Sequence, residues 1–452
     1  MSVIKEFSDL VTKKVSTGGN KLLKQNLLNA LPFWLGAIIT GIVAVIYAKL
    51  FALAETGTAY IWGHAPYLFF IITPVTFLIA WILVVKYAPF SRGSGIPQVN
   101  AAIEYANPKD NEKVDRLLSI RVIFVKILSS LVLVFGGGAI GREGPTIQIA
   151  GSIFKKINDL LPSWYPKVSK RNMIITGASA GLAAAFNTPL GGIVFAIEEL
   201  TKTHISFFKS ALLTGVIIAG LTALNFLGPY LYLGYPTLSN LSVWIFLPVI
   251  LIALITGIGG SALGSIILYI FDKKAALTKD YQKVIYTILC GLILASAAFF
   301  IDPRIFGSGK EIMVSTLFTS EKQMEWYIPI FRMIGPILSF TTGAAGGIFA
   351  PSLGAGASMG AVLSGWLELS ASDTNIVILC GMVGFLTGIT RSPFTSSILV
   401  LEMTNSHNII FYLMLTGLLA NIISNLIDRH SFYDKLKHKY MHEISLEEKA
   451  KA

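Results

Sequence analysis

The chain has 452 residues, of which 54% are apolar and only 13% are charged. Soluble proteins carry about twice that share of charged residues, and the mean hydropathy of +0.67 is also far above theirs. These values exclude soluble, fibrous and disordered proteins and predict an all-α polytopic membrane protein. The net charge of +11 comes from basic residues in short loops between apolar stretches. Basic residues in such loops set the orientation of a membrane protein, so we do not expect nucleic-acid binding.

Several apolar stretches are long enough to cross a bilayer, which takes about 20 residues. In chain order they lie at 28–53, 67–85, 117–138, 206–227, 241–271, 284–301 and 408–427. Shorter apolar pieces, interrupted by glycine, lie at 95–106, 144–154, 173–199, 327–341, 349–366 and 375–401. Helices that stop within a membrane must line a cavity enclosed by protein, and in transporters they usually mark the binding site. The alternative is that the glycines only let helices pack closely.

The positions of the charges predict the orientation of the chain. Lysine and arginine gather in loops at 1–25, 108–121, 155–171 and 272–283. Basic loops face the cytoplasm, so we expect both termini inside, in the plasma (inner) membrane of a cell. The expected divisions are a cytoplasmic N-terminal segment at 1–27, a transmembrane domain at 28–427 with halves near 28–227 and 241–427, and a cytoplasmic tail at 428–452 that is too short for a regulatory domain.

The sequence contains an internal repeat. The stretch at 177–200 aligns with the stretch at 381–404 when Pro189 is placed on Pro393. Upstream, GREGP at 141–145 matches GIFAP at 347–351, and GSG at 93–95 matches GSG at 307–309. Three motifs in the same order, about 205–215 residues apart, predict two halves of similar fold. If each half crosses the membrane an odd number of times, the halves are inverted and the site lies at their interface.

Three motifs place glycine before a proline that opens an apolar segment: GSGIP at 93–97, GREGP at 141–145 and GIFAP at 347–351. Proline suits the first turn of a helix, and a helix N-terminus offers unpaired N–H groups and about half a positive charge. Three such N-termini that meet in the membrane would bind an anion without a fixed cation. This favours transport, because a transported anion must also be able to leave.

Glu143 lies inside the GREGP motif, at a predicted helix start within the membrane. An ionisable residue in this position is a functional candidate by default. The alternative is a structural acid that caps the helix or forms an ion pair with Arg142.

The repeat separates two neighbouring acids. Glu198 aligns with Glu402, so we expect it to be structural, capping a neighbouring backbone. Glu199 aligns with Met403, so the fold does not require an acid there, and Glu199 is the better candidate for handling protons. A surface ion pair with Lys202 is the alternative for Glu199.

Motifs of enzymes and metal sites are incomplete in this sequence. The stretch GASAG at 177–181 has the pattern of a serine hydrolase without its strand–turn–helix context or a later histidine partner. The stretch GSGK at 307–310 resembles the end of a phosphate loop whose first glycine is replaced. The two cysteines lie in apolar stretches, and no histidine lies mid-span beside another. We therefore expect no enzymatic activity, no metal site and no cofactor.

The three motifs in this order resemble the chloride channel and transporter (CLC) family, in particular its prokaryotic-type chloride/proton antiporters. The resemblance covers nearly the whole chain. It implies a fold of two inverted helical halves, with many tilted and broken helices whose N-termini converge on an anion. It also implies a homodimer in which each subunit has its own anion pathway.

The resemblance implies a role for each matching residue. The implied chloride ligands are Ser94, Ile348, Phe349 and Tyr433. Glu143 resembles the gating glutamate, which takes the place of an anion until it is protonated, and Glu199 resembles the internal glutamate that passes protons in exchangers. The helix starts of the implied anion site are Gly93, Gly95, Pro97, Gly141, Arg142, Gly144, Pro145, Gly347 and Pro351. The chain departs from the family at Gln98, where a glutamate is common.

The sequence therefore predicts an antiporter that exchanges chloride for protons across a membrane. A passive chloride channel of the same fold is the chief alternative, and Glu199 argues against it because family channels usually carry an apolar residue there. A transporter for fluoride or nitrate is a second alternative, against which Ser94 and the intact GREGP motif argue. An intramembrane enzyme would need a catalytic dyad that the sequence lacks.

Overall fold

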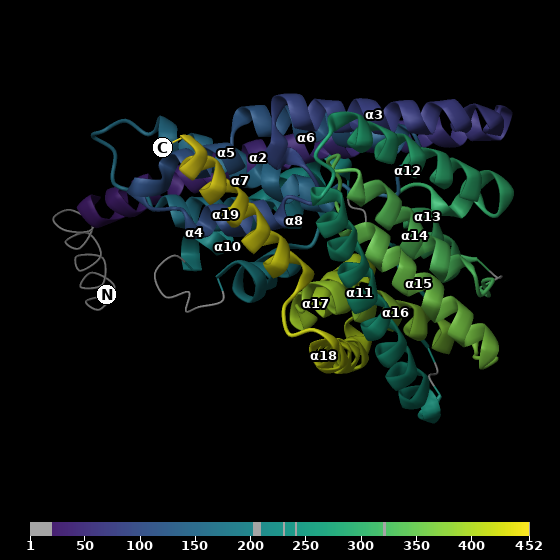
Figure 1. Cartoon of the computed structure of the whole chain (residues 1–452). Helices are drawn as coiled ribbons and strands as arrows, with labels where there is room; N and C mark the ends of the chain where they lie inside the picture. The colour runs from purple at the N-terminus through teal and green to yellow at the C-terminus, as the bar shows by residue number, and fades with distance from the viewer. Residues whose placement is uncertain (1–19, 202–208, 229–230, 240–241, 320–321, 452) are drawn as a thin grey trace, which may run out of the picture.

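The computed structural model describes residues 20–201, 209–228, 231–239, 242–319 and 322–451. Lys202 and residues 1–19 of the expected N-terminal segment lie outside these ranges. The described residues are almost entirely helical and contain two isolated β-bridges. The C-terminal helix α19 runs across the molecule between α4 and α11 (Figure 1).

The helices divide into two halves in chain order. The first half contains α2 (Asn20–His64), α3 (Phe69–Tyr87), α4 (Ile96–Glu104), α5 (Asn111–Leu117), α6 (Ile120–Phe135), α7 (Glu143–Leu160), α8 (Lys170–Phe186), α9 (Pro189–Phe195) and α10 (Lys209–Leu227). The second half contains α11 (Phe246–Ala275), α12 (Asp280–Phe300), α13 (Lys310–Phe318), α14 (Ile328–Thr341), α15 (Phe349–Trp366), α16 (Ala371–Thr390), α17 (Pro393–Thr404) and α18 (Ile410–Ile427), followed by α19 (Phe432–Lys451).

Within the described ranges, eight helical segments are long and apolar enough to cross a membrane. The helix α16 is one of them, although the sequence analysis placed 375–401 among the interrupted pieces. The stretch is interrupted, but at Arg391 and Ser392 and not at a glycine; before this break α16 runs unbroken for 20 residues, and its neighbours bury it from Asp373 onward. A helix enclosed by protein needs no apolar surface toward lipid, so its glycines and threonines lower its hydropathy without breaking it.

The two halves repeat the same local structures, as the sequence predicts. The helices α7 and α15 both have 18 residues, and α4 and α13 both have nine. The helices α8 and α16 both end at a residue in the left-handed conformation, Asn187 (φ 58°) and Arg391 (φ 61°). Each of these residues turns the chain into the next short helix, α9 or α17, that begins with a proline.

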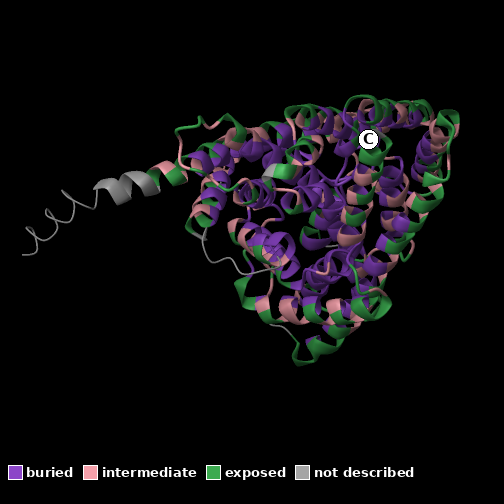
Figure 2. Cartoon of the chain, turned by 60° about the vertical axis from the view of Figure 1, so that its left-hand side comes forward, coloured by how far each residue is buried: buried purple, intermediate pink, exposed green. Residues whose placement is uncertain are grey.

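The three glycine–proline motifs all open helices, as predicted. The helices α4, α7 and α15 begin at Ile96, Glu143 and Phe349. The motif prolines, which therefore lie in the first turns, are Pro97, Pro145 and Pro351. Nearly every residue of α15 and α16 is buried, and the buried residues fill the middle of the molecule (Figure 2).

The C-terminal stretch that was expected to be a polar tail forms the helix α19. Its first residues, Phe432 and Tyr433, are buried in the interior. Further along, its charged side chains form ion pairs with residues of both halves. The paired residues are Lys437 with Glu104, Lys439 with Asp272, Glu443 with Arg92 and Glu447 with Arg116. These ion pairs fix α19, so the start of the helix has a defined position inside the protein.

Candidate functional site

Backbone hydrogen bonds join the loops that precede α4, α7 and α15. The N–H of Gly93 donates to the carbonyl of Ala344 over 2.8 Å, and the N–H of Gly346 donates to the carbonyl of Gly93 over 3.0 Å. Gly141 and Gly347 exchange two hydrogen bonds of 2.8 and 2.7 Å. These bonds bring the three helix N-termini to one place in the interior. The sequence-predicted helix starts, far apart in the chain, therefore do meet.

The pairing of Gly141 with Gly347 also shows how the two halves are related. These two glycines occupy the same position in the repeat, and each donates its N–H to the carbonyl of the other. Equivalent residues that contact each other in this reciprocal way are related by a local two-fold axis. The axis lies within one chain, as in a fold built from two inverted halves.

Two of the glycines are required by close approaches. A Cβ atom on Gly144 would collide with the hydroxyl and the carbonyl of Ser94. A Cβ atom on Gly141 would collide with the carboxylate of Glu143 and would lie 3.0 Å from the Cβ of Ala350. The missing side chains therefore make room for the polar groups of Ser94 and Glu143.

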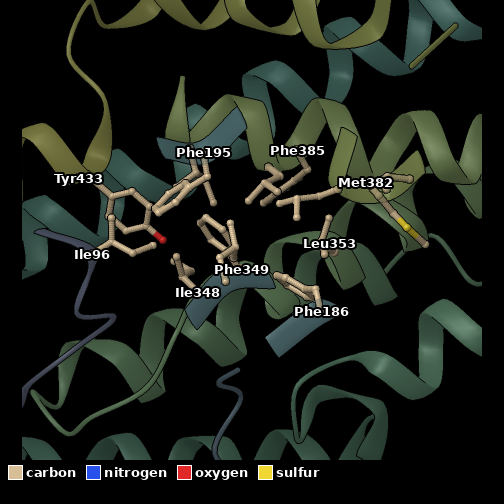
Figure 3. Packing of buried hydrophobic residues seen from close by; sticks show 14 of the residues in the cluster. Ile96, Phe186, Phe195, Ile348, Phe349, Leu353, Met382, Phe385 and Tyr433 are labelled. Atoms are coloured by element: carbon tan, nitrogen blue, oxygen red, sulfur yellow. The ribbon is translucent and has the colours of Figure 1, made fainter. Parts of the chain in front are cut away.

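Two hydroxyl groups from distant parts of the chain face each other in this interior. Ser94 and Tyr433 are 1% and 0% exposed, and beyond their mutual interaction neither hydroxyl has a hydrogen-bond partner among the described residues. Ile348 and Phe349 are also buried, and Ile348 is the N-cap of α15. The hydroxyl of Tyr433 points toward Ile348 (Figure 3). Buried polar groups almost always have partners, so two hydroxyls with no further partner beside a helix N-terminus are what an anion site requires.

Aromatic contacts hold Tyr433 and Phe349 in place. Their ring centroids are 6.1 Å apart, and the ring of Phe186 stacks on Phe349 from the other side at 6.5 Å. Phe432 packs against Tyr433 at 5.5 Å. Because Tyr433 comes after the last membrane span, only the fold of α19 brings it to the residues of the glycine–proline motifs.

Lys126 is a residue of this region that the sequence analysis missed. It lies in α6 and is completely buried, and its Nζ donates to the carbonyls of Ser91 and Gly93 over 2.8 and 2.7 Å. The amino group of Lys126 therefore anchors the loop before Ser94 through two of its backbone carbonyls. Its signal in the sequence was available, because a lysine in the middle of an apolar span is a functional candidate by default.

Glu143 is the first residue of α7 and is 1% exposed. The hydroxyl of Tyr232 donates to its Oε1 over 3.3 Å, and its Oε2 has no partner among the described residues. Arg142, which is also buried, is the N-cap of the same helix. The carboxylate of Glu143 thus lies where the positive ends of α7 and α15 meet, in the kind of position that an anion would take.

Glu199 lies apart from this group. It belongs to the π-helical turn Ala196–Thr201 that extends α9, and it is 4% exposed. Asn100 donates to its Oε1 over 3.1 Å, and the hydroxyl of Ser392 donates to its Oε2 over 3.0 Å. Lys202, the alternative partner considered for Glu199, lies outside the described residues. Single π-helical turns often occur at functional sites, because they place a side chain in a direction that an α-helix does not offer.

Glu199 shares the lining of a narrow internal void with Phe349 and Tyr433 of the central group, and this void is too narrow to hold a water molecule. Its lining residues are Phe195, Glu199, Phe349, Leu386, Thr390, Ser392, Thr395, Ser396 and Tyr433. Apart from Glu199 and Tyr433, the side chains that line it bear a hydroxyl group or are apolar. The void therefore contains no titratable side chain, other than Glu199 and Tyr433, that could carry a proton across it.

The acids Glu198 and Glu402 are structural, as predicted from the repeat. Glu198 accepts hydrogen bonds from the backbone N–H groups of Phe394 and Thr395 over 3.2 and 2.7 Å, at the start of α17. Glu402 accepts from those of Leu190 and Gly191 over 3.0 and 2.7 Å, at the start of α9. Each half thus caps the short helix of the other.

Comparison with known proteins agrees with this architecture. The family model described as voltage gated chloride channel matches residues 76–425. The chain belongs to this family. Among its curated relatives are two proteins named H(+)/Cl(−) exchange transporter ClcA, from Cronobacter sakazakii and Citrobacter koseri. They are 27% and 28% identical, over 92% of this chain in each case and over 91% and 89% of theirs.

Solved structures of CLC proteins show the same fold. The structure of a slow cyanobacterial Cl−/H+ antiporter is similar with a TM-score of 0.79, over 91% of this chain and 97% of that chain, at 22% identity. The structure of a CLC-type fluoride/proton antiporter is similar with a TM-score of 0.72, over 89% of this chain and 96% of that chain, at 20% identity. This CLC chain is therefore a multi-pass integral membrane protein built from two inverted helical halves.

Proposed function

We propose that this CLC protein exchanges chloride for protons across a membrane. The observation that carries the proposal is the buried carboxylate of Glu143, which has one unpaired oxygen at the junction of two helix N-termini. A carboxylate in such a position can occupy an anion site when ionised and leave it when protonated. The names of the curated relatives, which are H(+)/Cl(−) exchangers, support the same function.

Chloride would bind beside Glu143, in the space bounded by Ser94, Tyr433 and the first turn of α15. The hydroxyls of Ser94 and Tyr433 would donate to the ion, together with the N–H groups of Ile348 and Phe349. These donors are neutral, and the amino group of Lys126 is bound to backbone carbonyls of the loop before Ser94. An ion held by neutral donors can leave again, which conduction and exchange both require.

Protons would enter at Glu199 and reach Glu143 by a separate route. Asn100 and Ser392 hold the carboxylate of Glu199 at one end of the internal void. The lining of the void has no titratable side chain other than Glu199 and Tyr433, so we propose that water carries the proton from Glu199 to Glu143, and that the void widens to admit it. Protonation would neutralise Glu143 and free the anion position.

Two alternatives remain within the family. A passive chloride channel would use the same anion site without a proton donor, and the buried Glu199 with its two hydrogen bonds argues for exchange instead. Another anion, such as the fluoride named for one solved relative, would use the same helix N-termini. The hydroxyl of Ser94 favours chloride over these other anions.

We also propose that the protein is a homodimer. Glu198 and Glu402 lie half-buried near the outer surface, among exposed apolar residues such as Leu190, Ile197 and Phe394. Exposing carboxylates to lipid costs free energy, so we propose that a second copy of the chain, and not lipid, packs against this surface. From the basic loops we further propose that both termini face the cytoplasm, and that residues 28–427 form the transmembrane domain of a protein of the cell membrane.

A flux assay on the purified protein in liposomes tests the proposed function. An inward chloride gradient is imposed, and chloride and proton movements are recorded together. Proton movement driven by the chloride gradient alone supports an exchanger. Chloride movement without protons means a channel, and movement of neither ion rejects the proposal.

A further inference from the structure

The GSG loop of the second half repeats the conformation of the first. Gly307 and Gly309 have φ angles of 67° and 86°, and Gly93 and Gly95 have φ angles of 62° and 102°. The nine-residue helix α13 begins directly after the second loop, as α4 begins after the first. The two loops therefore present the same backbone and the same central serine.

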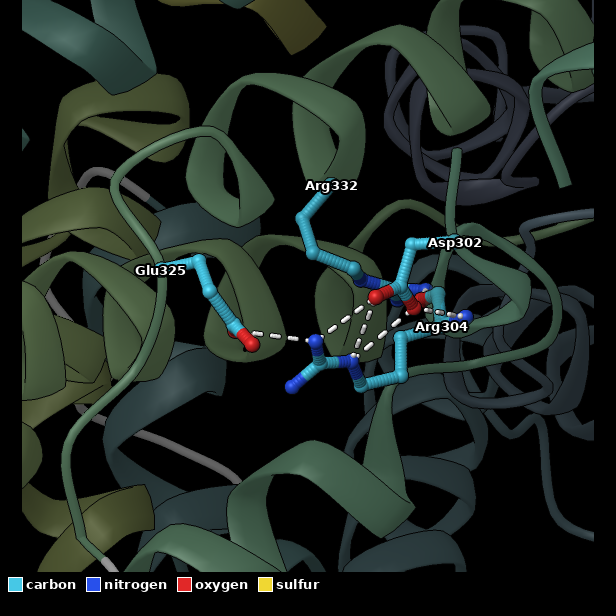
Figure 4. Close-up of polar contacts among 4 residues, drawn as sticks. All are labelled: Asp302, Arg304, Glu325 and Arg332. Atoms are coloured by element: carbon cyan, nitrogen blue, oxygen red, sulfur yellow. Dashed lines mark hydrogen bonds and ion pairs between the residues drawn. The ribbon is translucent and has the colours of Figure 1, made fainter. Parts of the chain in front are cut away.

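A buried basic side chain donates hydrogen bonds to the backbone carbonyls of each loop, Lys126 in the first half and Arg332 in the second. Arg332, which is completely buried, donates to the carbonyls of residues 304–307 over 3.0–3.4 Å. Arg304, on the same segment, is held by Asp302 and Glu325 (Figure 4). Arg332 lies as far before Gly347 in the sequence as Lys126 lies before Gly141. The repeat thus includes the cation that orients the loop.

The two loops differ in what contacts the serine. The hydroxyl of Ser94 faces Tyr433 and has no other partner among the described residues. In contrast, Glu55 of α2 accepts hydrogen bonds from both the N–H and the hydroxyl of Ser308, over 3.1 and 2.8 Å. A protein carboxylate therefore occupies the second loop. Glu55, Ser308 and Lys310 line a pocket of about 580 Å³, which is large enough for many water molecules.

The second loop is connected to Glu143 by two contacts. Lys310, the first residue of α13, places its Nζ 4.5 Å from the centre of the Tyr232 ring. The hydroxyl of Tyr232 donates to Oε1 of Glu143. An electrostatic interaction links Glu143 with Glu55 and with Lys310 as well. Glu55 binds Ser308 of the loop, and Lys310 directly follows this loop. Lys310 in turn contacts the ring of Tyr232, whose hydroxyl donates to Glu143.

We propose that Glu55 and Lys310 are positioning residues that set the pH at which Glu143 opens the anion pathway. This inference rests on the proposed function. The charged and titratable groups of the described chain that act on Glu143 are Arg142, Lys310, Glu55, Tyr47, Tyr232 and Tyr433. Among them, Glu55 and Lys310 line the water-accessible pocket, so they are the groups that connect Glu143 to that pocket electrostatically.

The signs of the two charges give the inference a specific signature. The negative charge of Glu55 favours the protonated, neutral form of Glu143, and the positive charge of Lys310 favours the ionised form. Without the charge of Glu55 the pathway should therefore open only at a lower pH, and without the charge of Lys310 it should already open at a higher pH. A merely structural role for both residues would not shift the pH profile in opposite directions.

The test measures chloride flux in liposomes as a function of pH, equal on both sides, so that the orientation of the protein does not matter. We expect Glu55→Gln to shift the midpoint by about 0.5 pH unit toward acid, and Lys310→Met by about 0.5 unit toward alkali. The double variant should return close to the wild-type midpoint. Lys310→Gln replaces Lys310→Met if the latter does not yield folded protein.

Glu311→Gln is the matched control, because Glu311 lines the same pocket but is exposed and its charge is screened by water and salt. Its midpoint should equal that of the wild type. Equal midpoints in all variants, or shifts in one direction for both, overturn the inference while the proposed function stands. Wild-type protein that moves no protons under a chloride gradient overturns the proposed function and the inference with it.

Discussion

The two halves of the chain share a scaffold and differ where the first half carries an acid. Glu143, at the start of α7, corresponds to Phe349 at the start of α15. Glu199 corresponds to Met403, which is completely buried. At the same positions, one half thus presents carboxylates to the interior and the other presents apolar side chains.

The features that the halves share have a different character. The reciprocal caps Glu198 and Glu402, and the buried cations Lys126 and Arg332, all have their partners within the scaffold. Both members of each pair bond to backbone groups. Residues kept in both halves therefore build the fold, and acids present in one half are the candidates for moving protons. The following variants test that division.

The largest effect is expected for Glu143→Gln. A neutral amide can neither carry the proton nor act as a competing anion, so coupled proton flux should fall at least about 100-fold while chloride still passes. Paired chloride and proton fluxes in liposomes measure this. A variant that still moves protons against their gradient would show that Glu143 is not the gate.

Glu199→Gln should stop proton movement almost as completely and leave chloride flux within about threefold of the wild type, because Glu199 lies outside the group that would hold the anion. The adjacent variant Glu198→Gln is the matched control and should retain coupling in the protein that folds. Normal coupling in Glu199→Gln would remove the main argument for an exchanger over a channel.

Glu198→Gln and Glu402→Gln should each lower the free energy of unfolding by about 1–3 kcal/mol, because an amide NH₂ group would then face a backbone N–H at a helix start. The two losses should be similar, since the caps are reciprocal. Thermal unfolding in detergent and the yield of folded protein measure them. A loss of coupling without a loss of stability would contradict the structural role.

Ser94→Pro is expected to have the smallest effect, a shift of about five- to tenfold in preference from chloride toward nitrate. Proline removes both a hydroxyl donor that suits a small spherical ion and the backbone N–H. Ser308→Ala is the counterpart control, because its hydroxyl already binds Glu55. Competition between the two anions in a flux assay decides whether Ser94 contacts the ion.

Much of this organisation could be predicted from the sequence. The compositional bias gives the membrane fold, and the glycine–proline motifs give the helix starts at Ile96, Glu143 and Phe349. The repeat alignment identifies Glu198 as a structural acid before any contact is known. These features are local, or depend on a pattern that appears twice in the chain.

The features that could not be predicted depend on distant contacts. The helix α16 is enclosed by other helices and has the lowest hydropathy of the eight candidate spans, so the sequence analysis did not separate it from the interrupted stretch 375–401. The spacing of Lys126 and Arg332 within the repeat is visible in the sequence, but their hydrogen bonds to backbone carbonyls of the loops are not. The contact of Glu55 with Ser308 joins residues that are far apart in the sequence and share no motif.

The reciprocal bonds between Gly141 and Gly347 have a consequence for biosynthesis. Until Gly347 is synthesised, the N–H and carbonyl of Gly141 lack the hydrogen-bond partner that they have in the folded protein. Unpaired backbone groups inside a bilayer cost several kcal/mol of free energy, by order of magnitude about the strength of a lost hydrogen bond. The partner emerges roughly 200 residues later, a delay of about 10–40 s at ordinary rates of translation. During that interval the newly inserted first half must keep this segment near water or held by the insertion machinery, and it matures only when the second half arrives.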